Sequence, residues 1–257
     1  MSSVSVEGNL PSVGIPLYFI GTSGWAYREW RHHWYPSSLP PRAWLSFYAE
    51  HFPTVEVNST FYTLPPPERF QTWARSVPPT FRFAIKAPRS FTHEHQLQIE
   101  EATFQRFRNA ISGLGARLGP ILWQLPPHFP CDTHRLRRFL AIVCGNGLEH
   151  AIEFRHPSWD IPEVWELLQS SNVAIVWSSS LRYPSFRLRT APFLYVRFHG
   201  LQGGYAHRYT EQELYPWAES TAEFLRQGYR MYAYFNNTAG TAPYDALRFR
   251  ELVERLL

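Results

Sequence analysis

Short apolar runs alternate with amphipathic segments along most of this chain. Most of the apolar runs are hydrophobic at nearly every position, as strands covered on both faces must be. Because such runs recur with helix-like segments between them, we expect a parallel sheet built from βα repeats. The pattern predicts eight strands, over Tyr18–Thr22, Thr54–Asn58, Phe81–Ala87, Pro120–Gln124, Ala151–Phe154, Val173–Trp177, Phe193–His199 and Met231–Asn236.

The intervening segments repeat apolar residues at helical spacing, which predicts amphipathic helices. Asp132, just before Thr133, and Thr210 stand where N-caps belong, because their side-chain oxygens can accept hydrogen bonds from a first helical turn. Helices are expected over Arg42–His51, Pro67–Ser76, Phe104–Leu114, Thr133–Val143, Pro162–Ser170, Glu211–Arg226 and Tyr244–Leu257.

Eight strands interleaved with helices predict a closed (β/α)8 TIM barrel, a fold that typically takes about 250 residues. A doubly wound open sheet is the alternative, but it needs a glycine-rich phosphate-binding turn after its first strand. Gly21-Thr22-Ser23-Gly24 lacks the GxGxxG spacing of that turn. No linker divides the 257 residues, so we expect one TIM-barrel domain over 17–257 after an N-terminal tail at 1–16.

The composition supports a globular protein inside the cell. A hydrophobic fraction of 44% and an aromatic fraction of 17% supply a large core and exclude general disorder. The net charge of +4 permits anionic ligands without demanding nucleic acid, since the arginines are spread along the chain. Cys131 and Cys144 flank one expected helix and would stand ~20 Å apart, too far for a disulfide. Without a signal-peptide pattern or an apolar run of about 18 residues, a cytoplasmic protein with no membrane partner is expected.

Polar residues gather at the carboxyl ends of the expected strands, where barrel enzymes carry their active sites. A buried polar group costs about 1–3 kcal/mol unless it is paired, so this set must satisfy its own members or a ligand. A self-satisfied plug of Glu56, Lys86, Glu153 and Arg197 is one interpretation, and a ligand site is the other. The whole set comprises Glu56, Asn58, Thr60, Lys86, Thr92, His93, Gln124, Glu153, Arg155, His156, Arg197, His199, Asn236 and Asn237.

Lys86 is the only lysine among 25 basic residues, so the other 24 (25 − 1) are arginines. Arginine cannot replace lysine where a compact charge, a tunable pKa or a nucleophilic amine is needed. We therefore interpret Lys86 as a residue retained for its amine. A lysine paired with Glu56 on the neighbouring strand is the simpler explanation.

Motifs spread along nearly the whole chain are similar to those of one family. They include Gly21-Thr22-Ser23-Gly24-Trp25, Val55-Glu56-Val57-Asn58-Ser59-Thr60-Phe61-Tyr62, Phe83-Ala84-Ile85-Lys86, Thr92-His93, Trp123-Gln124-Leu125-Pro126-Pro127, Glu153-Phe154-Arg155-His156, Arg197-Phe198-His199-Gly200 and Phe235-Asn236-Asn237. The sequence resembles the YecE-like family, catalogued as domain of unknown function 72. The resemblance implies a TIM barrel and a cytoplasmic protein, and it supplies no reaction. Ser178-Ser179-Ser180 departs from it, because such proteins often place an aspartate after strand six.

Two reaction classes fit these residues poorly. Glu56, Glu153 and His199 could meet at a metal, but the cations around them make poor electrostatics, so neither a metal nor another cofactor is expected. Glycoside hydrolysis needs two carboxylates about 5–9 Å apart. The two glutamates stand on strands that lie nearly across the barrel from each other.

An anion-binding site fits the charges best. The glycine-containing loops at 200–205 and 236–241 follow strands seven and eight, the usual phosphate seat of this fold. We expect a metal-independent lyase, isomerase or hydrolase for a small phosphorylated or carboxylated substrate. Glu56 or Glu153 would be the general base, His199 an acid or hydrogen-bond donor, and Lys86 an anion-binding or Schiff-base amine. The residues expected to bind substrate are Asn58, Tyr62, Gln124, Arg155, His156, Arg197, Tyr205, Asn236 and Asn237.

A nucleic-acid-binding or nucleic-acid-processing protein, related in fold to endonuclease IV-like barrels, is the alternative. Its basic and aromatic mouth would stack bases and contact phosphates, with an affinity that falls steeply as salt rises. The sequence predicts no oligomeric state.

Overall fold

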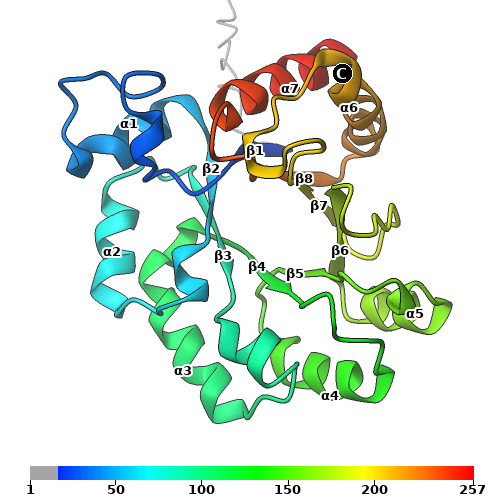
Figure 1. The fold of residues 1–257 in the computed structure, drawn as a ribbon. Helices are drawn as coiled ribbons and strands as arrows, with labels where there is room; N and C mark the ends of the chain where they lie inside the picture. Colours follow the sequence, from blue (N-terminus) through cyan, green and yellow to red (C-terminus); the bar gives the residue numbers. More distant parts are fainter. Residues whose placement is uncertain (1–16) are drawn as a thin grey trace, which may run out of the picture.

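The computed structural model describes residues 17–257, which form a closed barrel of eight parallel strands (Figure 1). Each strand pairs with its neighbours in sequence, and β8 closes the ring by pairing with β1 from Tyr18↔Met231 to Thr22↔Phe235. The predicted TIM barrel is confirmed, and the N-terminal tail predicted at 1–16 lies outside the described residues. The strands are β1 (Tyr18–Ser23), β2 (Thr54–Val57), β3 (Arg82–Lys86), β4 (Leu118–Gln124), β5 (His150–Glu153), β6 (Val173–Ser179), β7 (Phe193–Phe198) and β8 (Arg230–Phe235).

Helices surround this ring on the outside (Figure 1). The two N-caps are confirmed: the Asp132 carboxylate accepts a hydrogen bond from the Arg135 N–H at 2.8 Å, and Thr210 forms a capping box with Glu213. Cys131 and Cys144 are both free. The helices are α1 (Trp44–His51), α2 (Pro67–Arg75), α3 (Glu101–Ile111), α4 (Thr133–Val143), α5 (Pro162–Ser170), α6 (Glu211–Arg226) and α7 (Ala242–Leu256). None of those in residues 17–257 is long and apolar enough to cross a membrane.

The connection between β6 and β7, residues 180–192, contains no helix. It covers β6 with a loop whose polar groups bond to the strand. The Thr190 hydroxyl accepts a hydrogen bond from the Ile175 N–H at 2.8 Å and donates one to the Val173 carbonyl at 2.7 Å. The Trp177 indole donates to the Leu188 carbonyl at 2.9 Å. This loop therefore takes the place of one outer helix and leaves its first residues at the barrel mouth.

Two apolar layers hold the barrel together. Outward-facing strand residues pack beneath the helices in one large buried cluster. The interior is a second cluster, in which aromatic side chains of β1, β7 and β8 (Phe19, Phe193, Tyr195, Tyr232 and Tyr234) face alanines of β3, β5 and β6 (Ala84, Ala151 and Ala174). Large residues on one side and small ones on the other fill the centre, so the barrel is a packed core and ligands must bind above it.

Candidate active site

The inward side of each strand changes from apolar to polar at its carboxyl end. Side chains alternate across a strand, so every second residue continues the interior row. In β7 this row runs from Phe193 and Tyr195 to Arg197 and then His199. The same alternation brings together nine of the predicted residues, Glu56, Asn58, Lys86, Gln124, Glu153, Arg155, Arg197, His199 and Asn236.

A fully buried ion network forms the floor of the site. The Arg197 guanidinium lies between two carboxylates, donating to Glu56 Oε1 at 2.8 Å through Nη2 and to Glu153 Oε2 through Nη1. Glu56 also accepts hydrogen bonds from the Ser23 and Tyr195 hydroxyls, each at 2.7 Å. Because the guanidinium occupies the space between the two carboxylates, a glycosidic bond cannot lie between them as glycoside hydrolysis requires.

Glu153 connects the floor to the wall of the site. Its Oε1 accepts from Arg155 Nε at 3.1 Å and from His199 Nε2 at 2.9 Å. The Asn236 amide nitrogen lies 3.1 Å from His199 Nδ1. A carboxylate accepts and an amide NH₂ donates, so His199 carries its proton on Nε2 and both ring nitrogens are occupied.

These contacts set the protonation states of the floor. Burial alone raises the pKa of Glu56, but the Arg197 charge and three hydrogen bonds outweigh it and hold that pKa below its ordinary value. Burial likewise opposes ionisation of Glu153, yet the charges of Arg155 and Arg197 and the His199 contact hold its pKa well below the usual range. Burial lowers the pKa of His199 despite the neighbouring carboxylate. The floor thus contains two ionised glutamates and a neutral histidine at neutral pH.

A cavity of about 470 Å³ opens above the floor. Lys86 lines it with its Nζ 4.0 Å from the centre of the Phe61 ring. Within residues 17–257 no carboxylate lies at ion-pairing distance from Lys86, so the alternative of a Lys86–Glu56 pair is wrong: Arg197 occupies that carboxylate instead. Burial lowers the pKa of Lys86 to about 7, and the charges of Arg197 and Arg155 add to the shift. The lining residues are Tyr27, Asn58, Phe61, Tyr62, Lys86, His93, Gln124, Arg155, Arg197, Tyr205, Asn236 and Thr238.

Two predicted residues, His156 and Asn237, line neither this cavity nor the smaller one described below. Each lies beyond the end of its strand and follows a cavity-lining residue, Arg155 or Asn236, by one position. His156 Nδ1 accepts from the Ser158 N–H at 3.2 Å in the loop after β5. The Asn237 amide donates to Asp245 at 2.6 Å, which fixes the loop after β8 to α7. Both residues hold loops in place.

The cavity also contains four residues that were not among the predicted catalytic or substrate-binding residues. Tyr27, Phe61, His93 and Thr238 come from the loops after β1, β2, β3 and β8. Burial and the Lys86 charge lower the pKa of His93 to about 4, so this imidazole is neutral beside the lysine. Phe61 and His93 lie within the family motifs and Thr238 within the loop at 236–241, but these signals also mark many residues that pack the rim.

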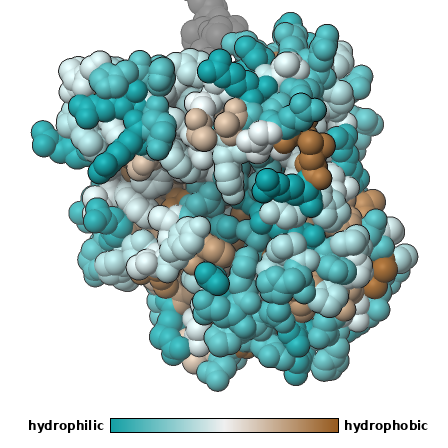
Figure 2. Space-filling view, in the orientation of Figure 1, coloured by the Kyte–Doolittle hydropathy of each residue, from teal (hydrophilic) through white to brown (hydrophobic). Residues whose placement is uncertain are grey.

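The rim of the cavity is exposed and aromatic. Tyr62 is 80% exposed and Tyr205 is 61% exposed, while Gln124 lies deeper with its amide donating to the Leu125 carbonyl at 2.8 Å. The surrounding face of the molecule is mostly hydrophilic (Figure 2). In residues 17–257 no three His, Cys, Asp or Glu side chains are grouped as metal ligands usually are. Ser178, the first of the three serines Ser178-Ser179-Ser180, lies beside Arg197 in the β6–β7 register.

Comparison with known proteins shows what this chain is similar to. It is 28% identical to UPF0759 protein YunF of Bacillus subtilis (strain 168), covering 87% of this chain and 90% of YunF. It is 31% identical to UPF0759 protein YecE of Escherichia coli (strain K12), covering 56% of this chain and 50% of YecE. The crystal structure of a DUF72 family protein from Thermotoga maritima superposes with a TM-score of 0.81 at 30% identity, covering 93% of this chain and 100% of that one.

A more distant likeness is to D-psicose 3-epimerase from Clostridium cellulolyticum H10, with a TM-score of 0.51 at 8% identity over 93% of this chain and 96% of that one. At that identity the likeness shows the barrel fold alone. The family described as "Protein of unknown function DUF72" matches residues 19–256, the entire barrel. The chain therefore belongs to the DUF72 family of YecE-like proteins.

Proposed function

We propose that the barrel mouth is the active site of an enzyme acting on a small anionic substrate, with Lys86 as its reactive amine. One observation carries the proposal: Lys86 faces a cavity of about 470 Å³ without a carboxylate partner in residues 17–257, and its pKa is about 7. An ordinary surface lysine is fully protonated at neutral pH. An amine with a pKa of about 7 is about half neutral under the same conditions, and its neutral form can take a proton or attack a carbonyl carbon.

The charge of the cavity supports an anionic ligand. Lys86, Arg155 and Arg197 line it, and no Asp or Glu is among its lining residues. Glu56 and Glu153 lie below the cavity, and Arg197 and Arg155 together balance their two negative charges, so protonated Lys86 gives the site its excess positive charge. The same charges repel a divalent cation, so we keep the expectation of a reaction without a metal or other cofactor.

The roles of the glutamates follow from their contacts. Glu56 and Glu153 have lowered pKa values and no unoccupied oxygen, so in this proposal they orient Arg197 and His199 while Lys86 takes the part of general base or nucleophile. The Asn58 side-chain oxygen is buried without a partner in residues 17–257 and can accept a hydrogen bond from a substrate hydroxyl. Proton transfer beside a carbonyl, or imine formation with it, corresponds to an isomerase or a lyase.

Reductive trapping tests this proposal, and the single lysine makes it unambiguous. The protein is incubated at pH 7.5 with glycolaldehyde phosphate and cyanoborohydride. The amine nitrogen attacks the carbonyl carbon, water leaves, and hydride from cyanoborohydride reduces the imine. At this pH roughly three quarters of an amine with pKa 7 is neutral, against roughly 0.1% of an unperturbed lysine. Allowing for its lower intrinsic nucleophilicity, we expect Lys86 to be labelled at least ~10-fold faster in the folded than in the urea-unfolded protein.

Peptide mapping separates Lys86 from the α-amino group, and Lys86→Met provides the protein without a lysine. Uncharged glycolaldehyde is the matched probe, and it should label Lys86 more slowly than its phosphate because it lacks the anion that the arginines attract. Equal labelling rates in the folded and unfolded protein would refute a reactive amine. Equal rates for the two aldehydes would refute the anionic substrate.

Binding of single-stranded nucleic acid is a second candidate, favoured by the exposed Tyr62 and Tyr205 beside Lys86 and Arg155. Aromatic faces stack on bases, and cations contact phosphates. Fluorescence anisotropy with a labelled 12-nucleotide strand tests it. Affinity that falls steeply with salt and weakens in a Tyr62→Ala, Tyr205→Ala double variant supports nucleic acid, whereas no binding at low salt removes this candidate.

A further inference from the structure

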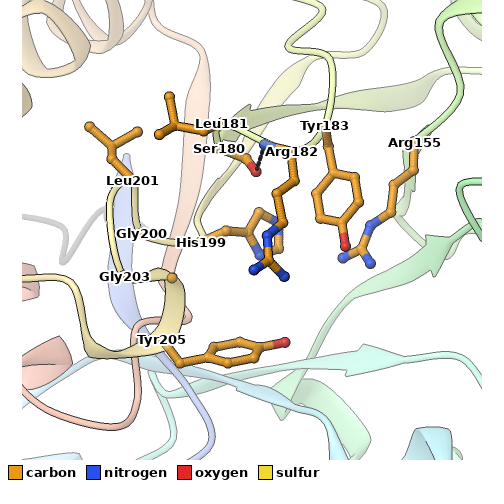
Figure 3. A pocket seen from close by; sticks show the side chains of 11 residues that line it. Arg155, Ser180, Leu181, Arg182, Tyr183, His199, Gly200, Leu201, Gly203 and Tyr205 are labelled. Atoms are coloured by element: carbon orange, nitrogen blue, oxygen red, sulfur yellow. Dashed lines mark hydrogen bonds between the residues drawn. The ribbon is translucent and has the colours of Figure 1, made fainter.

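A second cavity, of about 140 Å³, lies beside the first, under the loops that follow β6 and β7 (Figure 3). Arg155 and Tyr205 line both cavities, so the two are adjacent compartments of one mouth. The β5 end supplies Arg155, the β6–β7 loop supplies Arg182 and Tyr183, and the β7–α6 loop supplies Tyr205. The full lining is Arg155, Ser180, Leu181, Arg182, Tyr183, His199, Gly200, Leu201, Gly203, Gly204 and Tyr205.

Two guanidinium groups give this compartment its charge, and no Asp or Glu lines it. Arg155 is held in place, because its Nε donates to Glu153 and its guanidinium lies 4.0 Å from the centre of the Tyr183 ring. Arg182 has no carboxylate partner in residues 17–257. In Figure 3 the Arg155 and Arg182 side chains both point downward, to the side of the cavity on which Tyr205 lies.

The loop that forms the other wall is tightly constrained. Gly200, Gly203 and Gly204 have φ values of 82°, 85° and 56°, which favour glycine. A Cβ atom on Gly200 would lie 1.9 Å from the Gly204 carbonyl oxygen, so the loop turns back on itself at this point. The Gly200 N–H also donates to the Tyr209 hydroxyl at 2.9 Å. These contacts fix the start of the loop that carries Tyr205.

We infer that the second cavity binds a phosphoryl group at the far end of the substrate, while the reacting carbonyl lies beside Lys86. This inference rests on the proposed function and adds the substrate class, a phosphorylated carbonyl compound. A phosphoryl group has three terminal oxygens around one centre and accepts paired N–H donors from two arginines, whose fork geometry matches it. A space of about 140 Å³ is large enough for a group of this size. Arg155, shared by both cavities, would contact the substrate at both of them.

Calorimetric titration with inorganic phosphate tests the subsite. It compares the wild type with Arg182→Gln, Lys86→Met and a control, Arg138→Gln. The control also removes one arginine charge, but Arg138 is exposed on α4 and lines a different cavity. Hydrogen bonds to a charged group contribute about 1.5–3 kcal/mol, which corresponds to roughly 10- to 150-fold in affinity. We expect Arg182→Gln to weaken phosphate binding at least ~10-fold, with less than a threefold change in Lys86→Met and in Arg138→Gln.

The outcomes separate this inference from the proposed function. If Lys86→Met weakens phosphate binding and Arg182→Gln does not, phosphate binds in the first cavity; the second subsite is then refuted while the proposed function stands. If phosphate binds none of the proteins, or all of them equally, the subsite is refuted as well, and reductive trapping of Lys86 decides the proposed function independently.

Discussion

Replacing Lys86 by methionine should stabilise the protein below neutral pH. The folded state lowers the pKa of this amine from 10.5 to about 7, so the protonated form is disfavoured by folding. A shift of about 3.5 pKa units corresponds to about 5 kcal/mol, and solvent screening of a partly exposed side chain reduces this to roughly 2–4 kcal/mol. Methionine has a similar length and no charge, so it removes this cost and keeps most of the apolar contacts.

The pH dependence of this gain has a defined sign. Below pH 7 the lysine is protonated in both the folded and unfolded states, and the folded state carries the full cost. Between about pH 7 and 10.5 the unfolded chain binds one more proton than the folded one, so the stability of the wild type rises with pH and the advantage of the variant shrinks. Above about pH 10.5 both states are neutral and the advantage disappears.

Urea unfolding followed by tryptophan fluorescence at pH 6, 7, 8 and 9 measures this effect as the difference in the free energy of unfolding. Arg138→Met is the control, since it removes an exposed charge on α4 and should give a difference that does not vary with pH. A Lys86→Met protein that is less stable than the wild type at pH 6, or a difference that is constant from pH 6 to 9, would contradict the reasoning.

Two other substitutions test the floor and the wall of the mouth. Arg197→Met should lower the free energy of unfolding by about 3–5 kcal/mol, because it leaves two buried carboxylates without their cation. Urea unfolding measures this change. A loss below about 1 kcal/mol would contradict a stabilising role for the ion network. Gly200→Ala should lower the free energy of unfolding by about 1–3 kcal/mol or more, because the new Cβ would lie 1.9 Å from the Gly204 carbonyl oxygen. Thermal unfolding measures this loss. Gly145→Ala is the control, since Gly145 also has a positive φ but no atom lies within 4 Å of its Cβ position. A loss no greater than that of the control would contradict the close approach.

The strand ends were predictable because periodicity alone locates them. Each run of apolar residues ends in a polar one, and parallel strands bring such ends together whatever their order. The cavity lining also separates Arg155 from His156 and Asn236 from Asn237, because the alternation of side chains continues just past the ends of β5 and β8. Applied to the sequence, that rule would have placed His156 and Asn237 outside the site.

The pairing of charges was not predictable in the same way. Lys86 and Glu56 stand on adjacent strands, yet Glu56 binds Arg197, 141 residues away, because β7 and β2 both direct long side chains over the apolar interior. Which cation reaches which carboxylate depends on how far each side chain extends across the barrel, and this distance cannot be read from hydrophobic periodicity. Contributions from loops, such as Tyr27 and Thr238, depend on turn geometry that no periodicity records.

The closure of the ring between β1 and β8 bears on how this protein folds. Tyr18 pairs with Met231, so the β1–β8 pairing joins segments that are separated by nearly the whole chain. Forming this pairing costs much loop entropy before its contacts are made, which makes such a step slow. The floor of the mouth draws its charged groups from β2, β5 and β7 and is complete only when these strands share one ring. Helices can form before that step, but the perturbed amine of Lys86 cannot. Titration of this amine therefore reports the assembled barrel mouth, which helix content alone does not.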